Sequence, residues 1–175
     1  MEASDSRRRR FEELFERHHG HIAAYARRRA DASHVEDIVE ETFLVAWRRL
    51  ERVPEPALPW LYGVAWRVLA HQRRGERRRR AAMARLAGER RPADDAGIAA
   101  EVSEPLRGAL LALGEREREA VLLIAWEGLS PREAAIAAGC SSGAFRARLH
   151  RARRHLARSL RSGEANLLLA REEAL

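Results

Sequence analysis

The sequence contains no lysine, a single cysteine and no long apolar run. Its 33 basic residues are all arginines, against 26 acidic residues in a chain of 175. Cys140 alone cannot form a disulfide scaffold or a cysteine-based zinc site. No stretch approaches the ~18 consecutive apolar residues of a membrane-spanning helix, and the N-terminus lacks the apolar segment of a secretory signal. These absences predict a protein of the cytoplasm with no membrane insertion.

Signatures of catalysis and of metal binding are also missing. The seven histidines form no cluster with cysteine or carboxylates, and His18 and His21, at helical spacing, have no evident further ligand. The sequence has no glycine-rich loop that would hold a phosphate and no nucleophile–base motif. We therefore expect no metal, no cofactor and no enzymatic activity.

The residues that are abundant predict a folded, basic protein. Hydrophobic residues make up 46% of the chain, with only 6 prolines and a net charge of +7. Arginine and alanine each occur 33 times, which fits either a GC-rich genome or a use of guanidinium groups for phosphate and guanine recognition. The placement of the arginines favours a role in binding, because seven of them and no acid fall in residues 141–161.

Apolar residues recur at three- and four-residue spacings, the period of amphipathic helices, and no alternating strand pattern is found. We therefore predict an all-α fold of two small helical domains joined by a flexible linker. The predicted parts are a first domain over residues 8–80, a linker over 81–103, a second domain over 104–161 and a tail over 162–175.

The first domain is predicted to contain three helices. Ser33 and Glu36 have the S-x-x-E spacing of a capping box, so the second helix should begin at Ser33. Prolines at positions 54, 56 and 59 exclude helix from the loop before the third helix, which is expected from about residue 60 to 74 or beyond. Phe43 and Trp47 are expected in the core.

The second domain contains the pattern of a helix-turn-helix. Ser130 and Glu133 form a second predicted capping box, and Gly139 supplies the left-handed residue of a tight turn. Ser141 is predicted to cap the following helix, whose apolar stripe faces the core. The stripe consists of Phe145, Leu149, Ala152 and Leu156.

The outward face of this last helix is rich in arginine. Its residues are Arg146, Ala147, His150, Arg151, Arg153 and Arg154. The first part of such a helix can reach base edges, and later arginines can contact phosphates. A solvated basic face is the alternative interpretation. We disfavour it because we expect no acidic partner on this face, whereas surface helices usually mix charges of both signs.

Three sequence blocks together resemble the extracytoplasmic-function group of bacterial RNA polymerase sigma factors. The run LSPREAAIAAGCSSGAFRARLHRARRHL, residues 129–156, is similar to the family's region 4, which binds the −35 promoter element. The run EDIVEETFLVAW, residues 36–47, resembles region 2.2, and PWLYGVAWRVLA, residues 59–70, resembles regions 2.3 and 2.4. Two domains' motifs in the right order are a specific signal.

The resemblance implies partners and site residues. Asp37, Glu40 and Glu41 would bind the β′ clamp helices of core RNA polymerase, and region 4 would bind the β flap. The residues implied for −35 DNA are Arg146, Ala147, Arg148, His150, Arg151, Arg153 and Arg154. Those implied for −10 DNA are Trp66, Arg67, His71, Arg73 and Arg74. An anti-sigma factor is a further expected partner.

Promoter melting needs flipped bases held in pockets, and by resemblance the loop over about residues 51–58 would frame one. Trp60 and Tyr62 could stack on bases or belong to the core.

Three positions leave the base preference open. Ala147 stands where the family often has a small polar residue, and Trp66 and Arg67 replace a common Arg-Asn pair. Glu40 replaces a frequent glutamine. A helix-turn-helix regulator that never joins polymerase is the alternative function.

Overall fold

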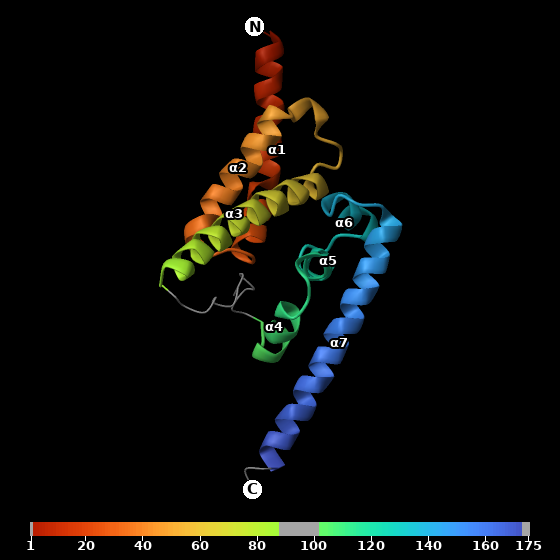
Figure 1. Cartoon of the computed structure of the whole chain (residues 1–175). Coiled ribbons are helices and arrows are strands. Elements are labelled where there is room, and N and C mark those ends of the chain that lie inside the picture. Colours follow the sequence, from red (N-terminus) through yellow and green to blue (C-terminus); the bar gives the residue numbers. More distant parts are fainter. Residues whose placement is uncertain (1, 88–101, 173–175) are drawn as a thin grey trace. The chain divides into compact units, whose positions relative to one another are not determined.

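The computed structural model describes the backbone of residues 2–87 and 102–172, and the side chains of residues 5–85 and 102–161. Within these ranges the chain forms α-helices and two short 3-10 helices, without a strand (Figure 1). It divides into two compact units, within residues 1–97 and residues 98–175. The predicted all-α fold of two helical domains is confirmed.

The first unit is built from three long helices. They are α1 (Glu2–Arg27), α2 (Val35–Arg48) and α3 (Leu58–Ala87), with the 3-10 helices η1 (Ala32–His34) and η2 (Leu50–Arg52) between them. Each of the three packs against the other two. Ile22, Ile38 and Leu61 are fully buried between them. Phe43 is buried as expected, whereas Trp47 is half-buried against Phe11, with ring centroids 5.2 Å apart.

The predicted capping box at Ser33 is wrong. Ser33 lies inside the 3-10 turn η1, so α2 begins two residues later at Val35 and has no side-chain cap. The Ser33 hydroxyl lies 3.3 Å from Nδ1 of His34 instead. A serine caps a helix from an extended backbone position, and here the extended residue is Asp31.

Helix α3 extends beyond the predicted first domain and into the segment assigned to the linker. Gly75 does not end it, and the arginines at 77–80 are helical. Glu76 holds this part of α3 to η1, with its Oε1 at 3.4 Å from Nε2 of His34, and its Oε2 lies 3.3 Å from Nη2 of Arg80. The rest of the predicted linker, residues 88–101, lies outside the described residues.

The second unit comprises α4 (Glu104–Leu111), α5 (Glu115–Ala125), α6 (Pro131–Ala137) and α7 (Ser142–Glu172). Helix α7 packs against each of the other three. Its predicted apolar stripe supplies the core: Phe145, Leu149 and Ala152 are buried, and Leu156 is half-buried. The helix continues past residue 161, where the sequence placed its end. The side chains of the predicted tail, residues 162–175, lie outside the described set.

The local signals of the helix-turn-helix are confirmed. Ser130 and Glu133 form the capping box, with the Glu133 carboxylate accepting from the Ser130 backbone N–H at 2.9 Å. Gly139 has a φ of 62°, the left-handed conformation that glycine adopts at least cost. The Ser141 hydroxyl accepts a hydrogen bond from the backbone N–H of Ala144 at 3.2 Å. These contacts fix the angle at which α7 leaves α6.

Candidate polymerase and promoter interfaces

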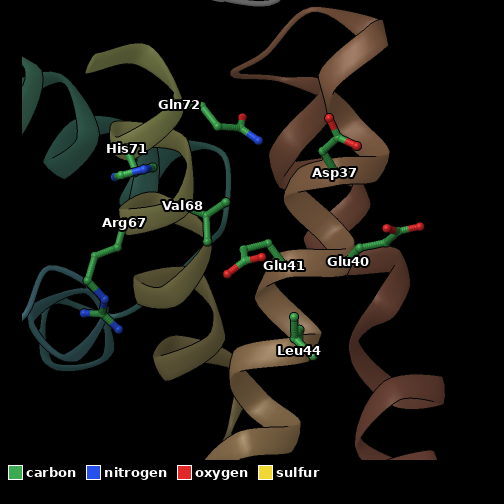
Figure 2. Close-up of a pocket in the computed structure, with 8 residues that line it drawn as sticks. All are labelled: Asp37, Glu40, Glu41, Leu44, Arg67, Val68, His71 and Gln72. Carbon is green, nitrogen blue, oxygen red and sulfur yellow. The ribbon is translucent and has the colours of Figure 1, made fainter. Parts of the chain in front are cut away.

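A groove of about 790 Å³ runs between α2 and α3 in the first unit. Its α2 wall carries the three acids predicted to bind polymerase, and all three are exposed. Its lining residues are Asp37, Glu40, Glu41, Leu44, Arg67, Val68, His71 and Gln72. Figure 2 shows Glu41 pointing towards α3, and Val68 and Gln72 pointing back towards α2.

The groove brings together residues predicted for two different partners. Arg67 and His71, predicted to contact −10 DNA, line the α3 side of the groove, and Figure 2 shows their side chains extending from α3 away from α2. Although the Arg67 side chain as a whole is exposed, partial desolvation of its guanidinium, and secondarily the charge of Arg49, lowers its pKa below the usual range. It remains charged at neutral pH, as arginine does in proteins. The α2 side of the groove therefore carries negative charge, and the positive charge of Arg67 lies at the edge of its α3 side.

The predicted −10 residues fall on two different faces of α3. Arg67, His71 and Arg74 are exposed and follow one another at four- and three-residue spacings, so they share a face. Trp66 is half-buried. Arg73 turns into the domain, where its Nη2 donates a 2.7 Å hydrogen bond to the carbonyl oxygen of Arg29. This contact joins residues 44 positions apart, and no local sequence pattern indicated it.

Trp60 and Tyr62, which the sequence allowed either to stack on bases or to lie in the core, differ in their surroundings. Tyr62 is 3% exposed and lies against Tyr25, with ring centroids 5.2 Å apart. Its ring therefore belongs to the core and is not presented for base stacking. Trp60 is half-buried near the start of α3.

A smaller cavity of about 180 Å³ lies where α1 meets the loop before α3. Its lining includes His18, Leu50, Val53 and Glu55. Burial, followed by the charges of His21 and Arg17, lowers the pKa of His18, and Glu55 opposes this shift. The lowered pKa favours the neutral form of the His18 ring. The sequence indicated the loop but missed His18, because the fold alone brings α1 to it.

On α7, six of the seven residues predicted to contact −35 DNA are exposed. They are Arg146, Ala147, His150, Arg151, Arg153 and Arg154. The seventh, Arg148, is half-buried, and its Nη1 lies 3.7 Å from the sulfur of Cys140 in the turn. Arg148 therefore lies against the turn of the motif.

The expectation that this basic face has no acidic partner is wrong. Glu117 on α5 forms an ion pair with Arg151, with 3.8 Å between Oε1 and Nε. Its other oxygen, Oε2, lies 3.2 Å from Nδ1 of His155. The sequence of residues 141–161 does not indicate these pairs, because the acid comes from another helix.

Family models match both units. The model described as Sigma-70 region 2 matches residues 14–79, and the one described as Sigma-70, region 4 matches residues 103–156. Together they account for more than half of the chain. The chain belongs to the sigma-70 family, in its extracytoplasmic-function group. This sigma factor binds core RNA polymerase and directs it to −35/−10 promoters. The region 2 match in the first unit disfavours a regulator that acts without polymerase.

Individual relatives agree with this assignment. The sigma factor is 32% identical over 169 residues to RNA polymerase sigma factor NccH of Alcaligenes xylosoxydans xylosoxydans, covering 88% of each chain. It is 34% identical over 170 residues to RNA polymerase sigma factor CarQ of Myxococcus xanthus, covering 92% of this chain and 94% of CarQ. Among solved structures it resembles CnrH in complex with the cytosolic domain of CnrY, with 28% identity, a TM-score of 0.60 and coverage of 87% and 88% of the two chains.

Two further absences hold for the described residues. No helix among them is long and apolar enough to cross a membrane. The described side chains also contain no group of three or more histidine, cysteine or acidic residues that could hold a metal ion.

Proposed function

We propose that the α2 side of the groove binds polymerase and that the exposed face of α3 binds −10 DNA. The supporting observation is the groove itself, whose α2 side carries three exposed acids and whose α3 side includes Arg67 and His71. Asp37, Glu40 and Glu41 would contact the β′ clamp helices. Arg67, His71 and Arg74 would contact the DNA backbone or bases, with phosphate attraction supplying much of the affinity. Arg73 bonds to the Arg29 carbonyl within the domain, and the half-buried Trp66 would contribute the part of its ring that is exposed.

In the second unit, the exposed residues of α7 would enter the major groove of the −35 element, with α4 and α5 supporting the helix from behind. Arg146 and Ala147 lie nearest the start of α7, so they would meet base edges, together with His150 and Arg151. Arg153 and Arg154 follow one turn later and would contact phosphates. This unit would also bind the β flap of polymerase.

We further propose that the cavity beside His18 receives a base flipped out of the −10 element. The neutral imidazole can donate one hydrogen bond and accept another, and its Nδ1 atom is buried without a hydrogen-bond partner among the described residues. A base edge entering the cavity would meet this group. His18→Ala should then change the preference at one −10 position and leave −35 preferences unchanged.

An anti-sigma partner is proposed from the solved neighbour, since the CnrH structure contains the cytosolic domain of CnrY. A sigma factor acts where polymerase is, so we place the protein in the cytoplasm. As an initiation factor it would have no catalytic role of its own. Pull-down of the tagged chain from its native host, followed by identification of a stoichiometric partner other than polymerase subunits, tests this part. Recovery of polymerase alone from both growing and stressed cells would contradict it.

The main test is reconstitution. The full chain is mixed with core RNA polymerase, and run-off transcription is measured on a linear promoter library randomised over the −35 and −10 elements. We expect specific start sites that require both proteins, and weak DNA binding by the chain alone. Tight sequence-specific binding without polymerase, or no transcription with it, would overturn the proposal.

A further inference from the structure

The backbone around Glu117 is held by hydrogen bonds to the neighbouring helix α4. It lies in the first turn of α5, and its side chain is 21% exposed. The adjacent Arg118 donates hydrogen bonds of 2.9, 3.1 and 3.0 Å to the carbonyl oxygens of Leu110, Leu111 and Leu113. These bonds tie the start of α5 to the end of α4. The Glu117 carboxylate is therefore presented to α7 from a rigid support.

The carboxylate contacts two residues that lie one turn apart on α7. Its Oε2 is 3.2 Å from Nδ1 of His155, and its Oε1 is 3.8 Å from Nε of Arg151. Residues four apart share a helix face, so one carboxylate reaches both. The contact to His155 holds one oxygen, which directs the other towards Arg151.

The ion pair involves Nε of Arg151. The Arg151 side chain is 60% exposed, so the other nitrogens of its guanidinium are available to DNA. Bidentate recognition of guanine or phosphate uses two N–H groups of the fork. A long arginine side chain loses rotamer freedom when it is fixed on DNA. An arginine that is already oriented loses less, so its contact to the matching base gains more free energy, while a base that cannot make the contact gains nothing.

We propose that Glu117 is a positioning residue that orients Arg151 for recognition of one −35 base pair. The proposal rests on the proposed base contact of Arg151. Glu117 also places a negative charge next to the DNA-binding face, which weakens the attraction to phosphates of any sequence. Its removal should therefore have two opposite effects: poorer discrimination at one base pair, and stronger binding to unrelated DNA.

The test uses holoenzyme reconstituted from the full chain and core polymerase, and a linear promoter library randomised over the −35 element. Bound sequences are counted for the wild type, Glu117→Gln, Arg151→Ala and the double variant. Arg151→Ala should flatten the preference at one position. Glu117→Gln should reduce the preference at that same position by roughly three- to tenfold, in the lower part of the range expected for coupled neighbours. It should have no further effect in the Arg151→Ala background.

Two further variants separate geometry from charge. Glu104→Gln removes an acid from the same domain whose ion pair, at 3.0 Å to Arg107, lies within α4, so base preference should not change. Glu117→Asp keeps the charge but shortens the reach. It should reduce discrimination without strengthening binding to unrelated DNA.

Each outcome decides the question. If Arg151→Ala flattens one position and both Glu117 variants leave that position unchanged, the positioning role is overturned while the base contact stands. If Arg151→Ala flattens no position, the base contact fails and the positioning role fails with it. If the Glu117 variants weaken all sequences equally and unfold at lower temperature, Glu117 is structural only.

Discussion

The guanidinium of Arg73 donates a 2.7 Å hydrogen bond to the carbonyl oxygen of Arg29, joining α3 to the residues that follow α1. Arg29 is itself buried, with its guanidinium carbon 3.8 Å from the centre of the Tyr25 ring. An arginine that resembles a DNA contact in the sequence therefore completes the hydrogen bonding of a buried turn.

Replacing Arg73 with alanine should destabilise the first domain. The Arg29 carbonyl would lose its charged donor, and an unsatisfied buried acceptor costs about 1–3 kcal/mol. Urea unfolding followed by tryptophan fluorescence measures the change. Arg74→Ala is the matched control, because Arg74 is the next residue and is exposed. If Arg73→Ala instead reduced the affinity for −10 DNA and left stability unchanged, Arg73 would be a DNA contact, as the sequence predicted.

Reversing charge on the α2 wall should abolish polymerase binding. Asp37→Arg combined with Glu41→Arg replaces two exposed negative charges by positive ones in the groove, so attraction to a basic partner becomes repulsion. Co-purification with core polymerase is the measurement, with circular dichroism as a check of the fold. Glu36→Arg, on the same helix and exposed, but absent from the groove lining, should co-purify normally. Retention of polymerase by the double variant would contradict the assignment of α2.

Two arginines of α7 should behave differently in DNA selection. Arg146→Ala should lower selectivity at one −35 position by about 1–3 kcal/mol, because a base contact carries sequence information. Arg154→Ala should weaken binding to all sequences and reduce the salt slope by about one. Holoenzyme binding to a −35 library at several salt concentrations separates the two. Equal weakening on all sequences by Arg146→Ala would make it a phosphate contact.

The capping box of α6 should make stability depend on pH in the acidic range. The Ser130 hydroxyl, and then its backbone N–H, lower the pKa of the Glu133 carboxyl by hydrogen bonding. The folded pKa is thus below the unfolded value of about 4.3. This contribution is therefore present above that value, and is lost as the pH falls through the folded pKa.

Ser130→Ala should cost about 1 kcal/mol at pH 7 and less at an acidic pH below the folded pKa of Glu133, where the carboxyl is protonated. Thermal unfolding of both proteins at the two pH values measures the difference. Ser141→Ala is the control, because the third residue of α7 is Ala144, which has no carboxyl to titrate. Its cost should be the same at both pH values. An effect of Ser130→Ala that does not vary with pH would show that Glu133 does not contribute through its charge.

The sequence by itself determined the helical fold, the two domains and the helix-turn-helix. Those signals are local: the Ser130–Glu133 box, Gly139 and the apolar stripe of α7 each act within a few residues, where backbone geometry fixes the partners. The Ser33 box had the same spacing and was wrong, because the tertiary path of the chain after α1 folds that residue into a 3-10 turn.

The tertiary structure alone decided which charged residues are paired and which are exposed. Arg73 meets Arg29, and Glu117 meets Arg151, across separations of 44 and 34 positions. Such contacts depend on how whole helices pack, which the spacing of residues along one helix does not encode. For the same reason the groove between α2 and α3, and the place of His18 beside the loop, emerge only when the helices are assembled.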